Sequence, residues 1–274
     1  MGPQARTPWR KGVWLLMAQI KLWLANRALN CSYTVTTGAE NASYPFSNAI
    51  DEDRLTVFKP NTIATTVIRI DLGAAYTIEG WAVSFHTLGT QTAAASLDYS
   101  AADNGAAATG DTNADGKSFT TNNNYVKAFA AASKRYWWVS ISAQDAVVQI
   151  GEIALFDLVR TLSRSPRFPA IRRKALNVAH GYTKGGYVHT TQYGSSRQEW
   201  DLDLSHMDRG TDFSYIWDDV DTYTTFKRPF WLSDQYYNST TGFDGYMIHI
   251  PEDELEGGAV ERDLQNLALR VRES

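Results

Sequence analysis

Short runs of β-forming residues, separated by turn-rich stretches, fill the first half of the chain and constrain the fold more than any other feature. Val, Ile, Leu, Trp and Phe recur in these runs, which lie at 67–72, 81–85, 136–141 and 149–156. Helical periodicity is nearly absent between them. This pattern is typical of an antiparallel sandwich. The stretch 101–121 is rich in Ala, Gly, Asn, Asp and Thr, so we expect an exposed loop there.

A chain of 274 residues has room for two ordinary domains. We expect an N-terminal extension at 1–16, a sandwich at 17–158, a basic linker at 159–174 and a second β-rich module at 175–274. The linker carries six Lys or Arg residues, two prolines and no acidic residue. A solvated or subunit-contacting connector is the favoured interpretation over phosphate binding, because a stacking platform needs several aromatics and Phe168 stands alone.

The second module shows two different periodicities. Trp200, Leu202 and Leu204 alternate with polar residues, which predicts a strand with one buried face. Between 211 and 223 apolar residues recur at helical spacing behind a Thr211 or Asp212 cap, so we expect one helix there. Alternation over 267–272 predicts a closing strand. The fold class is therefore mostly β, a jelly-roll sandwich followed by a β-rich module with about one helix.

The N-terminus has basic residues followed by the apolar stretch 13–18, which is superficially similar to a secretory signal. Lys21 and Arg27 interrupt the apolar pattern, and a start at Met17 with 20–24 as the first strand is the simpler interpretation. No segment approaches the ~18 consecutive apolar residues of a membrane span. We expect no membrane span.

Charge and cysteine content exclude further classes. The net charge of −4 gives no general attraction for a polyanion, so nucleic acid is not expected as a partner. Cys31 is the only cysteine, which excludes an intrachain disulfide and a cysteine-based zinc site. Packing must therefore stabilise the fold, either alone or together with a hard cation or neighbouring subunits.

Several segments together resemble the discoidin family of galactose-binding-like jelly rolls. They are spread over about 115 residues and occur in the family's order: NASYPFSNAIDEDRLT at 41–56, IRIDLG at 68–73, LDYSAADNG at 97–105, RYWW at 135–138 and IGEI at 150–153. The resemblance implies a β-sandwich, and carbohydrate binding through loops at one end of it.

Members of this family often hold a structural calcium ion at an aspartate-rich turn that a glutamate from the last strand closes. The matching positions are Asp51, Asp53, Thr56 and Glu152. A hard cation prefers several oxygens from a turn together with one carboxylate from elsewhere, so this implied ligand set is chemically reasonable. Glu52 stands where the family usually has glycine, and Phe58 where it usually has tryptophan, which leaves ordinary surface carboxylates as the alternative.

For sugar binding, the resemblance implies aromatic and Arg side chains in the loops at one end of the sandwich. Trp81, Trp137 and Trp138 fall inside predicted strands, so we expect them in the core. His86, at the end of its run, is the candidate sugar-binding residue, with a hydrogen-bonded structural histidine as the alternative.

Three segments of the second module resemble distal-tail and minor-tail proteins of the bacteriophage tail tip. They are WDLDL at 200–204, the predicted helix around YIW at 215–217, and FKRPFWLSD at 226–234. The resemblance implies a ring of copies around a tail axis, with Trp217, Phe230 and Trp231 at subunit interfaces. The alternative for each of these aromatics is the core of its own subunit.

The sequence lacks a recognisable catalytic constellation. It has no Gly-x-Ser-x-Gly elbow, no phosphate-binding loop and no pair of histidines at helical spacing for zinc. We therefore expect a structural virion protein of a phage tail tip, without enzymatic activity, whose partners are copies of itself, other tail proteins and host-surface glycans. The alternative is a carbohydrate-binding protein associated with a glycan-processing enzyme.

Overall fold

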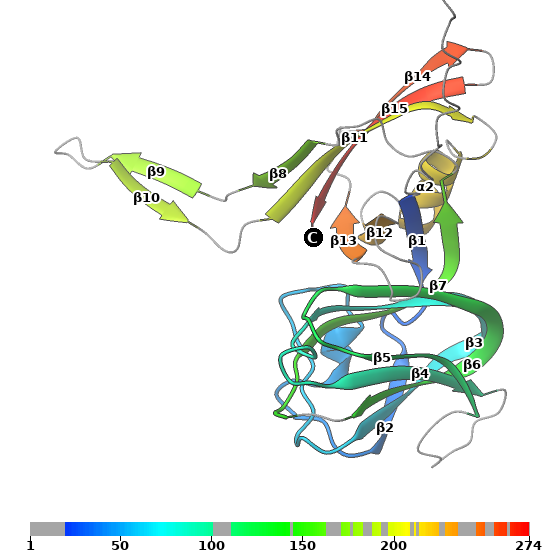
Figure 1. Ribbon diagram of the computed structural model, residues 1–274, viewed down its shortest axis with the longest axis vertical. Helices are drawn as coiled ribbons and strands as arrows, with labels where there is room; N and C mark the ends of the chain where they lie inside the picture. Colours follow the sequence, from blue (N-terminus) through cyan, green and yellow to red (C-terminus); the bar gives the residue numbers. More distant parts are fainter. Residues whose placement is uncertain are drawn as a thin grey trace, which may run out of the picture.

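A computed structural model describes residues 20–100, 111–142, 145–162, 171–175, 178–182, 188–192, 197–208, 211, 214–224, 228–234, 245–249, 255–261 and 264–273. Of the fifteen strands, thirteen belong to one continuous sheet whose pairings are antiparallel, and β9 and β10 form a separate two-stranded sheet. The helical segments among these residues are short (Figure 1). The expected mostly β fold is confirmed.

The sandwich is built by two long strands that fold back on themselves. Its elements are β2 (Ser32–Thr37), the 3-10 helix η1 (Phe46–Ala49), β3 (Thr66–His86), β4 (Ala94–Ser100), β5 (Thr112–Ser118), β6 (Tyr125–Ser142) and β7 (Ile150–Thr161). The pairing of β3 with β6 shifts register after Asp71 and again after Ile78, and Gly73 there has a φ of 78°. Both strands bend at this point (Figure 1).

The bends place the two halves of β3 and β6 in different layers. The N-terminal half of β3 pairs with β2 and with the C-terminal half of β6, which continues to β4 and β5. The C-terminal half of β3 pairs with β7. One sheet therefore closes over itself, and a sandwich results without a separate second sheet.

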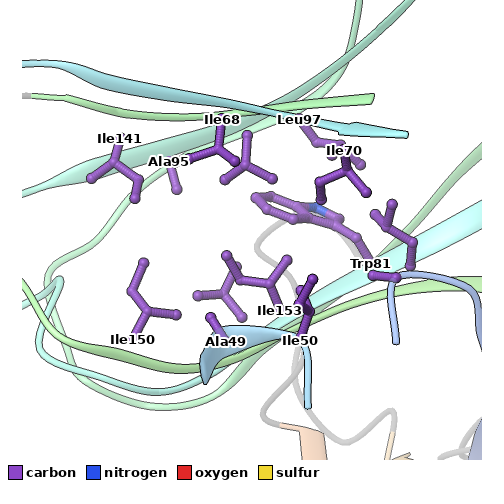
Figure 2. Packing of buried hydrophobic residues seen from close by; sticks show 14 of the residues in the cluster. Ala49, Ile50, Ile68, Ile70, Trp81, Ala95, Leu97, Ile141, Ile150 and Ile153 are labelled. Atoms are coloured by element: carbon purple, nitrogen blue, oxygen red, sulfur yellow. The ribbon is translucent and has the colours of Figure 1, made fainter. Parts of the chain in front are cut away.

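The apolar residues of alternate positions fill the space between these layers. Ile68 and Ile70 of one layer face Ile153 of the other, with Trp81 between them (Figure 2). Trp81 is fully buried, and its indole N–H donates to Asp115 Oδ2 at 2.8 Å, so its polar edge is satisfied at the margin of the core. Trp137 and Trp138 are also fully buried, as expected from their place in a strand.

The second module continues the same sheet. Its elements are β1 (Ile20–Asn26), β8 (Ile171–Ala175), β9 (Val178–Tyr182), β10 (Val188–Gln192), β11 (Arg197–Asp208), the π-helical turn η2 (Tyr215–Asp219), α2 (Val220–Thr224), β12 (Phe230–Asp234), β13 (Gly245–His249), β14 (Leu255–Glu261) and β15 (Leu264–Glu273). The predicted strands at 20–24, 200–204 and 267–272 are confirmed, and so is the helix. The helix starts on the Thr211 carbonyl, which accepts from the Tyr215 N–H at 3.0 Å, while the candidate cap Asp212 lies outside the described residues.

Strand β1 joins the two modules. It pairs on one side with β7, from Phe156 to Thr161, and on the other with β12. The first strand of the described residues therefore lies in the sheet between the sandwich and the second module (Figure 1). Of the expected linker 159–174, residues 159–161 complete β7 and 171–174 lie in β8, while 163–170 lie outside the described residues.

A second, smaller apolar cluster lies on the outer face of the sandwich, where β1 and β12 cover it. We call it the junction cluster, and its members are Trp23, Ala82, Val126, Ala154, Phe156 and Trp231. Trp23 and Trp231 are cross-strand partners, and Phe156 contacts both rings at centroid distances of 5.6 and 5.2 Å. A Cβ on Gly80 would lie 2.5 Å from the Trp23 ring, so only glycine permits this approach.

Two of the three aromatics expected at a subunit interface are buried within the chain, and one of them, Trp231, belongs to the junction cluster. Trp231 is completely buried and Phe230 is 2% exposed. The Trp231 indole donates to Ser84 Oγ of the sandwich at 3.2 Å, and the Trp23 indole donates to Ser233 Oγ at 2.8 Å. The interface assignment is wrong for Phe230 and Trp231, because packing within the chain already covers both rings. Trp217, 39% exposed on η2, stays a prediction.

The expected loop at 101–121 is also only partly correct. Residues 112–118 form β5, the edge strand beyond β4, and most of their side chains are exposed or half-buried. Polar residues can form an edge strand because the main chain supplies the pairing while the side chains stay solvated. Residues 101–110 lie outside the described residues.

Replacing Trp231 with alanine should lower the free energy of unfolding by about 3–5 kcal/mol, because it opens a cavity in the junction cluster. Trp217→Ala is the matched control and should cost clearly less, since Trp217 is 39% exposed. Urea unfolding monitored by circular dichroism measures both. Similar losses for the two variants would contradict this view of the junction.

Candidate functional site: an oxygen-lined turn at the junction

The residues with metal-ligand chemistry converge on the turn 48–56, which begins in the last residues of η1 and precedes β3. Asp51 and Asp53 shape it through their side chains. Asp51 Oδ1 accepts from the Asp53 N–H and Asp53 Oδ1 accepts from the Leu55 N–H, both at 2.9 Å. Such side-chain-to-backbone bonds define tight Asx turns and fix the carbonyl groups around them.

The Thr56 hydroxyl lies among three other oxygens of this turn. Its Oγ1 is 3.1 Å from the Asn48 carbonyl oxygen, 2.8 Å from Asp51 Oδ2 and 2.9 Å from the Asp53 carbonyl oxygen. One hydroxyl proton can serve only one of these acceptors at a time. The turn thus gathers more oxygen lone pairs than it has donors, which is the environment a hard cation prefers.

Glu152 reaches the same turn from β7. It is completely buried, its Oε2 accepts from the Glu52 N–H at 3.0 Å, and its Oε1 has no hydrogen-bond partner. Burial raises the pKa of the Glu152 carboxyl well above its usual range, and the nearby carboxylates of Glu52, Asp51 and Asp53 raise it further. A bound cation would offset this unfavourable environment, so the orphaned oxygen fits a ligand role.

The two departures from the family pattern are both accommodated. Glu52 has a φ of 60°, the left-handed conformation that a glycine would adopt most easily. Phe58 is completely buried, packs edge-on against Phe46 at 5.3 Å, and exchanges backbone hydrogen bonds with Ile150. Both residues are thus accommodated, Glu52 by its left-handed backbone and Phe58 by burial in the core.

The four implied ligands meet here, although not all as expected. The Thr56 hydroxyl contacts Asp51 through its carboxylate and Asp53 through its carbonyl oxygen, and Glu152 accepts from the Glu52 N–H of the same turn. Among the described residues no group of three or more His, Cys, Asp or Glu side chains gathers for a metal. A calcium site does not require one, since carbonyl and hydroxyl oxygens count as ligands. The Asn48 carbonyl could not be identified from the sequence, because every residue type carries one.

His86 does not fit its expected sugar-binding role. The side chain is 4% exposed, packs edge-on against Phe119 at 4.8 Å, and accepts from the Leu88 N–H through Nδ1 at 3.3 Å. Burial lowers the pKa of His86 to about 4. It is a neutral core histidine and cannot reach a ligand in solution.

Polar groups at the loop end of the sandwich are better placed for a sugar. The loops after β3 and before β6 are tied together: the Thr90 N–H donates to Asn122 Oδ1 at 2.9 Å, and Asn122 Nδ2 donates to Thr90 Oγ1 at 2.6 Å. The Asp145 N–H of a third loop donates to the Gln91 carbonyl at 2.9 Å. We call these loops the polar rim. Thr90 and Asn122 are exposed, and their amide and hydroxyl groups are the kind that bind sugar hydroxyls.

Comparison with known proteins gives a structural likeness alone. No family model and no curated protein sequence matches the chain. Solved structures that it resembles include chitosan-binding module 2 of a Paenibacillus sp. IK-5 chitosanase/glucanase in complex with chitotriose, at 21% identity over 48% of this chain and 99% of that one, with a TM-score of 0.42. The CBM32 module of AlyQ with 4,5-unsaturated mannuronic acid is 18% identical over 47% and 98%, with a TM-score of 0.39. A fucose-binding module of Streptococcus pneumoniae is 11% identical over 49% and 99%, with a TM-score of 0.38.

The class of fold follows from the topology described above. The first module is a β-sandwich built from antiparallel strands, as expected. Within the described part of the chain, no helix is long and apolar enough to cross a membrane.

Calcium should raise the thermal midpoint of the full chain relative to the same protein in EDTA, because a ligand bound only by the folded state stabilises it by mass action. Glu152→Gln should abolish the shift, since it removes the carboxylate that closes the turn. Asp145→Asn, an acidic residue of the polar rim, is the control and should keep it. An unchanged midpoint in wild-type protein would remove the cation from this site.

Acid should destabilise the protein partly through His86. Because the folded pKa of His86 is about 4 and its unfolded value is 6.5, its stabilising contribution is complete above pH 6.5 and is lost as the pH falls toward 4. By about pH 5 the loss should reach about 2 kcal/mol. His86→Leu should show a correspondingly shallower decline in urea-unfolding free energy between neutral pH and pH 5, and parallel curves would contradict the burial of a neutral ring.

Proposed function

We propose that this chain is a non-catalytic structural protein of a tailed-phage tail tip that presents a glycan-contacting sandwich on a rigid, ring-forming base. In this proposal the second module assembles with copies of itself and with other tail proteins, and the sandwich meets host-surface glycans. The protein then resides in the virion.

The observation that carries the proposal is the shared sheet at the junction. β7 leaves the sandwich and continues into the second module. There β1 lies between β7 and β12 and pairs with both. A module that only brings an enzyme near its substrate works at the end of a flexible linker, because it needs reach and no fixed angle. A module that is continuous with its base through hydrogen-bonded strands keeps a fixed direction, and this suits a component of an ordered assembly.

The segments that resemble tail-tip proteins support the same proposal. They fold as β11, as η2 with α2, and as β12, and β12 completes the sheet beside β1. The order of strand, helix and sheet-completing strand is the one that the resemblance implies.

The hairpin of β9 and β10 is a further argument for assembly. It projects from the body of the molecule, and its strands pair only with each other within the described residues (Figure 1). An isolated two-stranded hairpin is marginally stable in water. A neighbouring copy of the chain would supply the missing contacts, and a head-to-tail contact that closes by rotation makes a ring.

The glycan partner of the proposal rests on the polar rim. The neighbours in fold bind chitotriose, a mannuronic acid derivative and fucose, as their names state. In this chain the rim offers Asn122 and Thr90, held in place by reciprocal hydrogen bonds. A preorganised set of polar groups loses little entropy on binding a sugar.

Light scattering on the purified full chain, followed by negative-stain imaging, tests the assembly. We expect a closed oligomer, and we expect a monomer when residues 178–192 are replaced by a short Gly-Ser turn. Asn122→Ala is the matched control: it should leave the oligomer intact and reduce retention on glycan columns. A wild-type protein that stays monomeric and is retained on a glycan column would contradict the tail-tip role and favour a carbohydrate-binding partner of a glycan-processing enzyme.

A further inference from the structure

The oxygen-lined turn contacts the second module as well as the sandwich. Glu52 lies at the centre of these contacts. Its main-chain N–H donates to the buried Glu152, and its carboxylate accepts from Arg228, which precedes β12, with Nε and Nη2 at 3.1 and 2.9 Å from its two oxygens. A single residue thus bonds to the candidate cation ligand through its backbone and to the second module through its side chain.

Strand β1 is tied to the same residue. Asn26, the last residue of β1, donates from Nδ2 to Glu52 Oε1 at 3.4 Å, and its own Oδ1 accepts from the Leu155 N–H of β7 at 3.1 Å. The Glu52 side chain is only 7% exposed, whereas Arg228 is 43% exposed. The carboxylate is therefore held inside the junction while its partner reaches it from the surface.

The conformation of Glu52 adds to this argument. A φ of 60° is strained for a residue other than glycine. Glycine would relieve this strain but would lose the bidentate pair with Arg228. We therefore attribute a role to the Glu52 side chain, which is its contact with Arg228 at the junction of the two modules.

We infer that a divalent cation in the turn acts as a lock between the two modules, with Glu52 as the positioning residue that transmits its binding to Arg228 and β12. The cation would draw together the Asn48 and Asp53 carbonyls, the Asp51 and Glu152 carboxylates and the Thr56 hydroxyl. This fixes the backbone at Glu52, and the fixed backbone aims the carboxylate at Arg228. The inference goes beyond the proposed function, because it holds for any role of the protein in which the sandwich must keep its direction.

Linkage makes the effect reciprocal. If the cation strengthens the Glu52–Arg228 pair, the pair must strengthen cation binding by the same factor. The coupling cannot exceed the strength of the ion pair itself. Because Arg228 is exposed, we expect a factor of about two- to fivefold.

Hydrogen exchange of the full chain with calcium chloride, compared with the same protein in EDTA, tests the lock. Calcium should slow exchange of the amides of β12, at 230–234, by about two- to fivefold in the wild-type protein. In Arg228→Gln and in Glu52→Gln this slowing should disappear, while the amides of 51–56 stay protected by calcium. Calorimetry should show calcium affinity weakened by the same factor in both variants.

Arg135→Gln is the matched control. Arg135 is as exposed as Arg228 and forms a bidentate pair with Asp71, at 2.6 and 2.8 Å, but within the sandwich. This variant should keep the calcium effect on β12. The lock is overturned if wild-type protein binds no calcium, if calcium leaves β12 exchange unchanged, or if Arg228→Gln behaves like Arg135→Gln. Should Glu52→Gln fail to fold, Arg228→Gln decides the matter alone, and the oligomeric state of wild-type protein reports separately on the tail-tip role.

Discussion

The pairing of β1 with both β7 and β12 is the contact on which the rest of the structure depends. It places residues 20–26 between β7 and β12, which are far apart in the sequence, and it buries Trp23 against Trp231 and Phe156. Without this strand, the C-terminal end of β7 and the edge of β12 would be unpaired, and the outer face of the sandwich would expose apolar side chains. Hydrogen bonding and apolar burial act on the same few residues, so the junction should open only as a whole.

Much of the architecture could be predicted from the sequence because it depends on local pattern. Alternation identified β11 and β15, and helical spacing identified the segment around Ile216 and Val220. The junction could not be predicted, because nothing local tells whether Trp23 or Trp231 packs within its own chain or against another. Phe230 and Trp231 were assigned to an interface for that reason, and the same holds for His86, whose place at a strand end gave no indication of burial by Phe119. β5 was missed because edge strands tolerate the polar composition of a loop.

For the candidate cation turn, sequence and structure contributed different things. Its side-chain ligands were implied by a resemblance, while the contacts that give it a specific role in this chain come from the structure. Glutamate is unusual at position 52, where the family usually has glycine. The structure explains it, because the Glu52 carboxylate pairs with Arg228. Glu52 replaces the usual glycine at a strained backbone position, and this points to a link between the sandwich and the second module. Its negative charge points to a basic partner, which is Arg228.

The central claim is that the sandwich and the second module form one rigid body through β1. Native-state hydrogen exchange measures it most directly, by comparing the opening free energies of β1 and β12 with those of β3 in the core of the sandwich. If the claim holds, the most protected amides of all three strands exchange only through global unfolding, with one common dependence on denaturant. Exchange of β1 and β12 through a separate, low-energy opening that leaves β3 protected would contradict it.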